Sequence, residues 1–401
     1  MGAVCFTVPM RQRERRKLPF LVIAIVFLVT ISSCATSPAT QQQSDLSAIL
    51  DDVRRTSAAA WDVDVPGIGA AVISGTDDVV GAVSGVADPP GSTILTAGDR
   101  FHVGSLTKTF TAALVMLLDQ EGALSLNDPL SRWIAYPGGD GITVRMLLGH
   151  TSGLPDFTSS AELTREESPQ EAVALAAQMD PLFAPDSDWA YSNTNYMMLG
   201  LISELASGEP WARQIRSQFL EPLGLDSTYV WTGEPQGPTI TGSRLACGYS
   251  PEPECTPMPG LQLLPVVDGA DWTLAWAAGA LVSTPDDIAR WISQLVGGDV
   301  LDSEHRDLLT TATPQSEAAL ADMPAFGPTH WSGASLGLLQ YEIDGLGVAW
   351  GHEGSINGFV ANAAYIDETQ TTVAVTSNFA MTDSFAALGD IALRVTVEST
   401  G

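Results

Sequence analysis

Basic residues are scarce in this chain of 401 residues, which has 18 lysines and arginines against 47 aspartates and glutamates and a formal charge of −29. A polyanion of this strength repels nucleic acid and anionic lipid, so the folded body is not expected to bind either. No pattern recurs at a period of about 20 to 50 residues, which excludes repeat architectures. The hydrophobic content of 45% supports a large core and excludes a wholly disordered chain.

Long hydrophobic runs are also missing, except at residues 18–31, which follow five of the chain's basic residues. This run is shorter than the roughly 20 residues of a membrane-spanning helix but matches the core of a secretory signal peptide. We therefore expect residues 1–33 to be an export signal. Cys34 follows two serines in a pattern that resembles the lipobox of bacterial lipoproteins, so it is either the lipidated first mature residue or an inert residue near an ordinary cleavage site.

Residues 34–44 are small and polar, which is typical of a flexible tether. Beyond them, cysteine occurs only at Cys247 and Cys255. These two either form a bridge that closes a short loop or remain separate thiols. No residues near them have the spacing of metal ligands, and neither a metal nor an organic cofactor is implied.

Strand patterns lie at both ends of the chain, and helical patterns lie between them. Strand-like runs occupy residues 65–74, 79–86, 335–343, 347–351, 358–367 and 371–378, with helical patterns at 45–60 and 383–397. We expect an α/β (α+β) fold in which an antiparallel sheet, built from both chain ends and flanked by helices, carries a mostly helical insertion. The approximate boundaries are residues 45–104 and 331–401 for the sheet part and 105–330 for the helical part, with a catalytic helix and a cleft at their interface.

Lysine is nearly absent after the export signal, where twelve arginines stand against a single lysine, Lys108. Where charge alone is needed this chain uses arginine, so a site that keeps lysine needs an amine that can lose its proton. Lys108 follows Ser105 by three residues, at the start of an apolar run over residues 110–118. One helical turn places the two side chains at neighbouring positions on one face.

The helix expected over this run is apolar nearly all round, which predicts burial on every side. Burial lowers the pKa of Lys108, and a neutral amine beside a hydroxyl can act as the base that makes Ser105 a nucleophile. Free N–H groups at the helix N-terminus favour negative charge developing there. The alternative is an N-capping serine and a lysine that reaches solvent; the single lysine and the buried helix favour catalysis.

A second pattern, Tyr191, Ser192 and Asn193, precedes a helical run at residues 194–205. A tyrosine hydroxyl near a cationic lysine can ionise and pass a proton, and an asparagine amide can both donate to and accept from a substrate amide. Without Ser105 and Lys108 this tripeptide would be read as a loop tyrosine before a helix N-cap.

A third pattern covers residues 351–355, which include His352, Gly354 and Ser355 and lie between two strand patterns. Its glycines allow the close approach of a ligand's backbone. An edge strand that ends at a cleft offers N–H groups to an extended substrate and can complete an oxyanion hole. The alternative for His352 is an ordinary surface histidine.

The three patterns together resemble the serine β-lactamase and penicillin-binding-protein superfamily, in the branch of class C β-lactamases, Streptomyces-type D-alanyl-D-alanine carboxypeptidases and related esterases. The family's S-x-x-K matches Ser105 to Lys108, and its Y-x-N matches Tyr191 to Asn193. Its K-T-G or H-x-G matches His352 to Gly354. The similarity covers most of the chain, and residues 100–105, 142–156 and 279–287 resemble the family as well.

The resemblance implies a role for each matched residue. Ser105 is expected as the nucleophile, Lys108 and Tyr191 as the proton-handling pair, Asn193, His352, Gly354 and Ser355 as substrate-binding residues, and the N–H groups of Ser105 and Ser355 as the oxyanion hole. His352 would replace the lysine of the third motif. D-Alanyl-D-alanine carboxypeptidase activity is the first expectation, followed by β-lactamase, esterase or an inactive binding protein.

One position departs from the family, since carboxypeptidases usually have a hydroxyl residue at the centre of the third motif and this chain has Glu353. Two like charges about 4 Å apart repel by roughly 4 kcal/mol at an effective dielectric of 20, so Glu353 would oppose a free substrate carboxylate. Glu353 could instead accept an amine or a neutral ester, be protonated, or point away while Ser355 supplies the hydroxyl.

Residues 333–337 also fit the G-x-S-x-G pattern of α/β-hydrolases around Ser335. That pattern must follow a strand and open a helix, whereas this copy leads into a strand-like run, so we reject it. We expect a monomer that acts on a small molecule or a peptidoglycan peptide. It would be anchored through Cys34 to the outer face of a bacterial membrane, or else be secreted.

Overall fold

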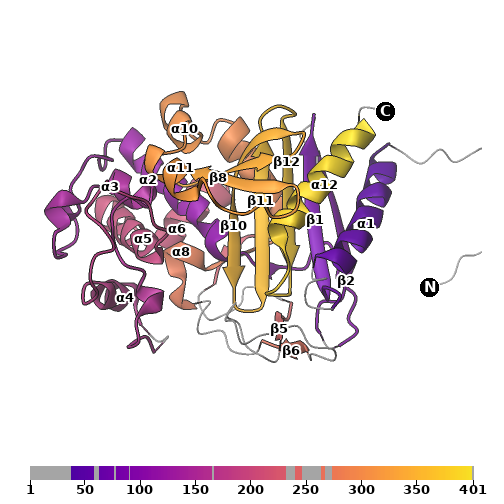
Figure 1. The fold of residues 1–401 in the computed structure, drawn as a ribbon, viewed down its shortest axis with the longest axis horizontal. Coiled ribbons are helices and arrows are strands. Elements are labelled where there is room, and N and C mark those ends of the chain that lie inside the picture. The colour runs from indigo at the N-terminus through magenta and orange to yellow at the C-terminus, as the bar shows by residue number, and fades with distance from the viewer. Residues whose placement is uncertain are drawn as a thin grey trace, which may run out of the picture. The chain divides into compact units, whose positions relative to one another are not determined.

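A seven-stranded sheet occupies the centre of the fold, with strands in the order β2, β1, β12, β11, β10, β9, β8 (Figure 1). Its strands are β1 (Gly67–Ser74), β2 (Val79–Gly85), β8 (Thr329–Ala334), β9 (Leu339–Ile343), β10 (Gly347–Ile356), β11 (Phe359–Ile366) and β12 (Thr371–Ser377). All neighbouring pairs are antiparallel. Because β1 pairs with β12, the expected antiparallel sheet built from both chain ends is confirmed.

The computed structural model describes residues 38–57, 63–75, 78–89, 91–164, 167–231, 240–245, 263–266 and 273–399. The predictions for the export signal, for Cys34 and for Cys247 and Cys255 lie outside these residues. Within them, no helix is both long enough and apolar enough to span a membrane.

Helices and short strands make up the rest of the regular structure among the described residues. The α-helices are α1 (Pro38–Thr56), α2 (Thr107–Gln120), α3 (Val144–Leu148), α4 (Pro169–Ala176), α5 (Asn193–Ser207), α6 (Trp211–Ile215), α8 (Trp276–Gly279), α9 (Pro285–Ile292), α10 (Ser303–Leu309), α11 (Pro314–Leu320) and α12 (Ser384–Ser399). Short strands β3 (Phe101–His102), β4 (Tyr229–Val230) and β7 (Leu281–Ser283) form one small sheet, and β5 (Ser243–Leu245) pairs with β6 (Leu263–Pro265).

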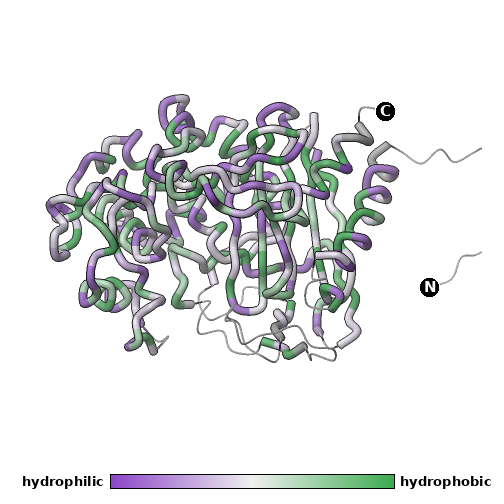
Figure 2. Tube along the Cα trace, in the orientation of Figure 1, coloured by the Kyte–Doolittle hydropathy of each residue, from purple (hydrophilic) through white to green (hydrophobic). Residues whose placement is uncertain are grey.

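The two faces of the sheet are covered by different parts of the chain. On one face α1 and α12 lie side by side over the sheet and share a core with Ile68, Val373 and Val375 (Figure 1). Figure 2 shows α1 with its hydrophobic residues toward the sheet and its hydrophilic residues on the outer side. On the other face α9 and α2 pack against the strands, and this core continues through the helical middle of the chain. Burial on both faces explains why β12 is apolar or small throughout.

The structure differs from the expected elements at three places. Residues 335–343, predicted as one strand, contain the turn between β8 and β9. The expected tether includes residues 38–44, which begin α1 with a proline in the first turn, where proline favours helix. The third motif does not lie between two strands but inside β10, because Gly351 and Gly354 continue the extended backbone. Residues 38–401 form one compact unit, so the division into a sheet part and a helical part stays a prediction.

Candidate active site

Ser105 lies in a short 3-10 turn, Gly104–Leu106, that leads directly into α2. Ser105 is partly exposed, whereas Lys108, one turn further, has 0% of its surface exposed. Most of α2 is buried, as its nearly uniform apolar sequence predicts. The structure therefore places an accessible hydroxyl and a desolvated amine on consecutive turns of the same segment.

The Lys108 amine makes three short contacts. Its Nζ lies 2.9 Å from Ser105 Oγ, 2.8 Å from Asn193 Oδ1 and 2.7 Å from the Ala278 carbonyl oxygen. Burial lowers the pKa of Lys108 to about 7, although nearby Asp156 and Glu353 oppose this shift. A neutral amine has two N–H groups and one lone pair. In that form it can donate to the amide and the carbonyl while its lone pair accepts the proton of Ser105.

Asn193, the first residue of α5, connects Lys108 to Asp156. Its Oδ1 accepts from Lys108, and its Nδ2 donates to Asp156 Oδ2 at 2.9 Å. Asp156 Oδ2 also accepts the Asn193 N–H at 3.2 Å, and its Oδ1 accepts from the backbone and hydroxyl of Thr158. Both carboxylate oxygens are thus fully used within the protein. Asp156 lies in residues 142–156, which resemble the family, but no local pattern in the sequence indicates its role.

Tyr191 lies close to both Ser105 and Lys108. Its hydroxyl hydrogen-bonds Ser105, and its ring centre lies 4.9 Å from Lys108 Nζ. Burial raises the pKa of Tyr191 well above its ordinary value, although the hydrogen bond with Ser105 lowers it. The sequence-based expectation that Lys108 would promote ionisation of Tyr191 is therefore not supported. A protonated tyrosine can relay a proton, while Lys108, whose pKa is near neutrality, is the group able to accept it.

His150, which the sequence interpretation gave no role, holds the segment that carries Tyr191. Its ring stacks on the Tyr191 ring with centres 4.6 Å apart. Its Nδ1 accepts the Ser192 N–H at 3.2 Å, and its carbonyl accepts the Ala190 N–H at 3.1 Å. Burial lowers the pKa of His150 well below its ordinary value, so the ring is neutral and can accept at Nδ1. His150 therefore fixes the backbone on both sides of Tyr191.

The third motif approaches the Ser105 turn at very close range. A Cβ at Gly354 would overlap the Val103 carbonyl and would lie 2.9 Å from the Ser105 nitrogen. On the facing turn, Gly104 has a φ of +51°, and a Cβ there would lie 2.9 Å from the Ser355 nitrogen. Only glycine allows this approach of two backbones. It brings together the Ser105 turn and the Ser355 backbone, the two segments expected to form an oxyanion hole.

The pairing of β10 with β9 ends at Gly351, and β10 continues past β9 to Ile356 beside this turn. His352 is buried, and burial together with the charge of Lys108 lowers its pKa to about 3. Its Nδ1 is held by the Glu353 carbonyl, and its ring centre lies 6.3 Å from that of Tyr191. His352 is thus a neutral neighbour of Tyr191 and adds no positive charge to the site.

Glu353 is partly buried, and burial raises its pKa to about 7, with Lys108 opposing this shift. Its charge also raises the pKa values of Tyr191 and Tyr341. Among the residues that the structure describes, no hydrogen bond or ion pair joins its carboxylate to a partner, and its carbonyl oxygen is bonded by His352. Of the alternatives left open by the sequence, a raised pKa favours a Glu353 that is readily protonated.

A cavity of about 350 Å³ opens next to Ser105. Its lining includes Gly104, Ser105, Phe157, Asn193, Leu274 and Ser355. Within the described ranges, no group of three or more histidine, cysteine or acidic side chains is placed to hold a metal ion. Ser335, of the rejected G-x-S-x-G pattern, is buried in the β8–β9 turn, where its hydroxyl donates to the Leu309 carbonyl.

Comparisons with known proteins agree with this geometry. The sequence profile described as Beta-lactamase matches residues 53–398. Penicillin-binding protein 4* of Bacillus subtilis is 35% identical over 143 residues, which cover 34% of this chain and 32% of that protein. An unguisins hydrolase of Aspergillus campestris is 27% identical over 79% of this chain and 60% of its own length. The chain thus spans a third to three fifths of these relatives.

Among solved structures, a D-amino acid amidase from Ochrobactrum anthropi in complex with D-phenylalanine is similar to this chain. It aligns with a TM-score of 0.73 and 25% identity, over 89% of this chain and 99% of the amidase. The alignment therefore covers most of this chain and nearly all of the amidase.

Proposed function

The chain belongs to the β-lactamase family, and from this membership and the contacts of Ser105 we propose that it hydrolyses amide or ester bonds through an acyl-enzyme at Ser105. The observation that carries the proposal is the buried Lys108 amine 2.9 Å from the Ser105 hydroxyl, with a pKa of about 7. Membership of a serine hydrolase fold supports it, as do hydrolases and amidases among the relatives.

In the proposed reaction, neutral Lys108 accepts the proton of Ser105 as Oγ bonds to the substrate carbonyl carbon. The negative charge on the carbonyl oxygen is met by the N–H groups of Ser105 and Ser355. Tyr191 then donates its hydroxyl proton to the leaving group and is reprotonated by Lys108, so no proton is lost. Deacylation follows the same course: water gives a proton to this pair as its oxygen bonds to the acyl carbon, and the pair returns that proton to Ser105 Oγ as the acyl–Oγ bond breaks.

For the substrate, we propose an acyl donor whose carbonyl belongs to a D-amino-acid residue. A penicillin-binding protein and a D-amino acid amidase are among the similar proteins, which supports this class. The D-alanyl-D-alanine carboxypeptidase reaction falls within it, with β-lactam and short-ester hydrolysis as neighbouring activities. We further propose that the protein is exported as a monomer, anchored through lipid on Cys34 or else secreted, and that it acts on small molecules or peptidoglycan peptides without nucleic acid.

Four substrates test the proposal on the mature protein: a fluorescent penicillin, a chromogenic cephalosporin, a short acyl ester and a D-alanyl-D-alanine peptide. We expect covalent labelling or turnover with at least one, and its complete loss in Ser105→Ala. Labelling that persists in Ser105→Ala would refute the assigned nucleophile. Turnover of the ester alone would make the protein an esterase, and inertness toward all four would favour a binding protein.

A further inference from the structure

Ser105 lies between two chemically different sides of the cleft. The cavity beside it is lined by Asn193 and Ser355, but neither Tyr191 nor Glu353 belongs to its wall. Tyr191 hydrogen-bonds Ser105, and Glu353 precedes Gly354, whose backbone lies against the Ser105 turn, so both residues adjoin the nucleophile on a second side, outside this cavity. Because Tyr191 gives its proton to the leaving group in the proposed reaction, the leaving group lies on this second side and the acyl group occupies the cavity.

Two carboxylates act on Lys108, and they differ in their bonding. Asp156 accepts four hydrogen bonds, from Asn193 and Thr158. Glu353 accepts none from the described residues, although it is partly buried. A buried carboxylate without a partner is costly and is a frequent mark of a ligand site. Asp156 is therefore part of the scaffold, whereas Glu353 is available to a ligand.

Two other buried polar side chains on the same face of the sheet as Glu353 also lack a hydrogen-bond partner among the described residues. Asn362 lies directly opposite Glu353 in the β10–β11 register, so the two side chains are on one face of the sheet. Asn362 is fully buried, and neither its Oδ1 nor its Nδ2 has a hydrogen-bond partner among the described residues. The buried Tyr341 hydroxyl, whose pKa Glu353 also affects, has none either. Glu353 and Asn362 are thus facing polar side chains without a hydrogen-bond partner among the described residues, and Tyr341, opposite Ala349 on the same face of the sheet, carries a third such group.

The charge of the site points in the same direction. Lys108 is the one positive charge that acts on the pKa of Glu353, and Lys108 must be neutral to accept the Ser105 proton. When Lys108 is neutral, no positively charged side chain among the described residues is known to balance the charge of Glu353. The chain as a whole carries a formal charge of −29. Like charges brought together at a binding site are strongly disfavoured, so an anionic leaving group is opposed both at long range and on contact.

We propose that Glu353 is a specificity-determining residue that makes the enzyme prefer acyl donors with a cationic or neutral leaving group over donors that end in a free carboxylate. The preferred substrates are then D-residue amides, including amides of basic amines, rather than D-alanyl-D-alanine peptides. This inference rests on the proposed function, because it requires an acyl-enzyme at Ser105.

Three substrates with one acyl group test it: N-acetyl-D-alanyl-D-alanine, its C-terminal amide, and the N-acetyl-D-alanine amide of cadaverine. They present an anionic, a neutral and a cationic leaving group. We expect the wild-type kcat/KM to be about tenfold to hundredfold lower for the anionic substrate than for the other two. Glu353→Gln should bring the three values close together, and Glu353→Thr, which restores a hydroxyl, should favour the anionic substrate further.

Glu342→Gln is the matched control, because Glu342 is exposed on the adjacent strand β9 and makes the same change in net charge. It should leave the wild-type preference intact. Equal use of the three substrates by the wild type, or a preference that Glu353→Gln leaves unchanged, would overturn the inference while Ser105 acylation still supports the proposed function. Failure of all three substrates to acylate Ser105 would refute the proposed function on amides and the inference with it.

Discussion

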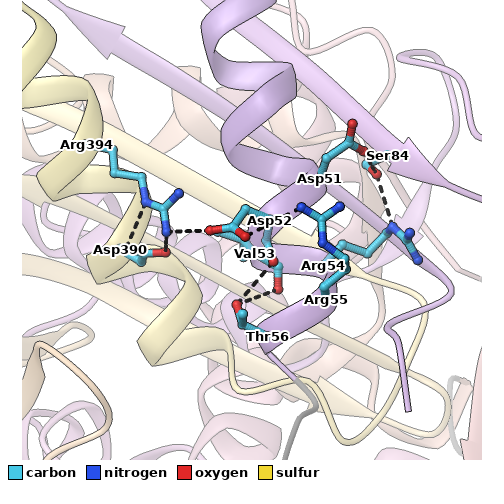
Figure 3. Close-up of polar contacts among 9 residues, drawn as sticks. All are labelled: Asp51, Asp52, Val53, Arg54, Arg55, Thr56, Ser84, Asp390 and Arg394. Atoms are coloured by element: carbon cyan, nitrogen blue, oxygen red, sulfur yellow. Dashed lines mark hydrogen bonds and ion pairs between the residues drawn. The ribbon is translucent and has the colours of Figure 1, made fainter.

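Two clusters of side chains each place two carboxylates near one basic residue. The two basic residues differ in how far they are buried. In the candidate active site, Lys108 of α2 has no exposed surface, and the charges of Asp156 and Glu353 act on it. On the back of the sheet, Arg394 of α12 binds Asp52 of α1 at 2.8 Å and Asp390 at 2.7 Å, with 37% of its side chain exposed (Figure 3).

Two carboxylates and one basic residue are present in both clusters, but the pKa of the basic residue shifts in opposite directions. At Arg394 the carboxylates prevail: hydrogen bonds to Asp390, with those to Asp52, raise the pKa of the guanidinium. At Lys108 desolvation prevails over both carboxylates and lowers the pKa to about 7. The difference shows that water access, rather than the number of neighbouring charges, determines whether a basic residue is a permanent cation or a proton acceptor.

The largest effect on the acylation rate should come from exchanging lysine and arginine between the two clusters. Lys108→Arg keeps the charge but cannot give it up, so acylation should fall by about a thousandfold or more. The reciprocal change, Arg394→Lys, should leave acylation unchanged because only a positive charge is needed there. Stopped-flow acylation with a fluorescent penicillin or the ester substrate measures both. An active Lys108→Arg variant would show that the amine is not the base.

A smaller loss is expected when the support of Tyr191 is removed. His150→Phe keeps a ring for stacking but removes the Nδ1 acceptor of the Ser192 N–H, so the Tyr191 hydroxyl should move relative to Ser105. Displacements of this kind cost about tenfold to hundredfold in rate. The loss should appear in kcat, with KM nearly unchanged, whereas general destabilisation would also lower the melting temperature. Unchanged kcat would mean that His150 does not position Tyr191.

The pH dependence tests how far Glu353 acts on Lys108. The active amine is neutral, so kcat/KM should rise with pH through a midpoint near 7, the pKa of Lys108. Glu353 raises that pKa, and Glu353→Gln should therefore move the midpoint to lower pH. Since the pKa of Glu353 is also about 7, the wild-type midpoint belongs to the coupled pair. A midpoint that Glu353→Gln leaves in place would show that the two groups do not interact.

The extent to which the sequence predicted this site follows from how local each signal is. Ser105 and Lys108 are one turn apart, and the apolar run that buries Lys108 is visible in the sequence, so their juxtaposition could be predicted. The antiparallel sheet could also be predicted, because alternation and turn residues are local. The roles of His150 and Asp156 could not be predicted, because their contacts with Tyr191 and Asn193 span about 40 residues of chain and leave no periodic signal in the sequence. The continuation of β10 through His352 was not predicted, because the two glycines beside it are typical of a loop.

The smallest effect is expected at the exposed cluster of Figure 3. Arg394→Ala removes hydrogen bonds to Asp52 and Asp390, but both partners are accessible to water and can be solvated instead. Exposed ion pairs contribute little, so the melting temperature should fall by no more than about 2 °C at low salt. The difference should shrink at high salt, because screening weakens the wild-type pair. Neither kcat nor its pH midpoint should change. A large loss of stability that is insensitive to salt would mean that Arg394 acts through packing of α12 on α1, and that burial contributes at both clusters rather than at Lys108 alone.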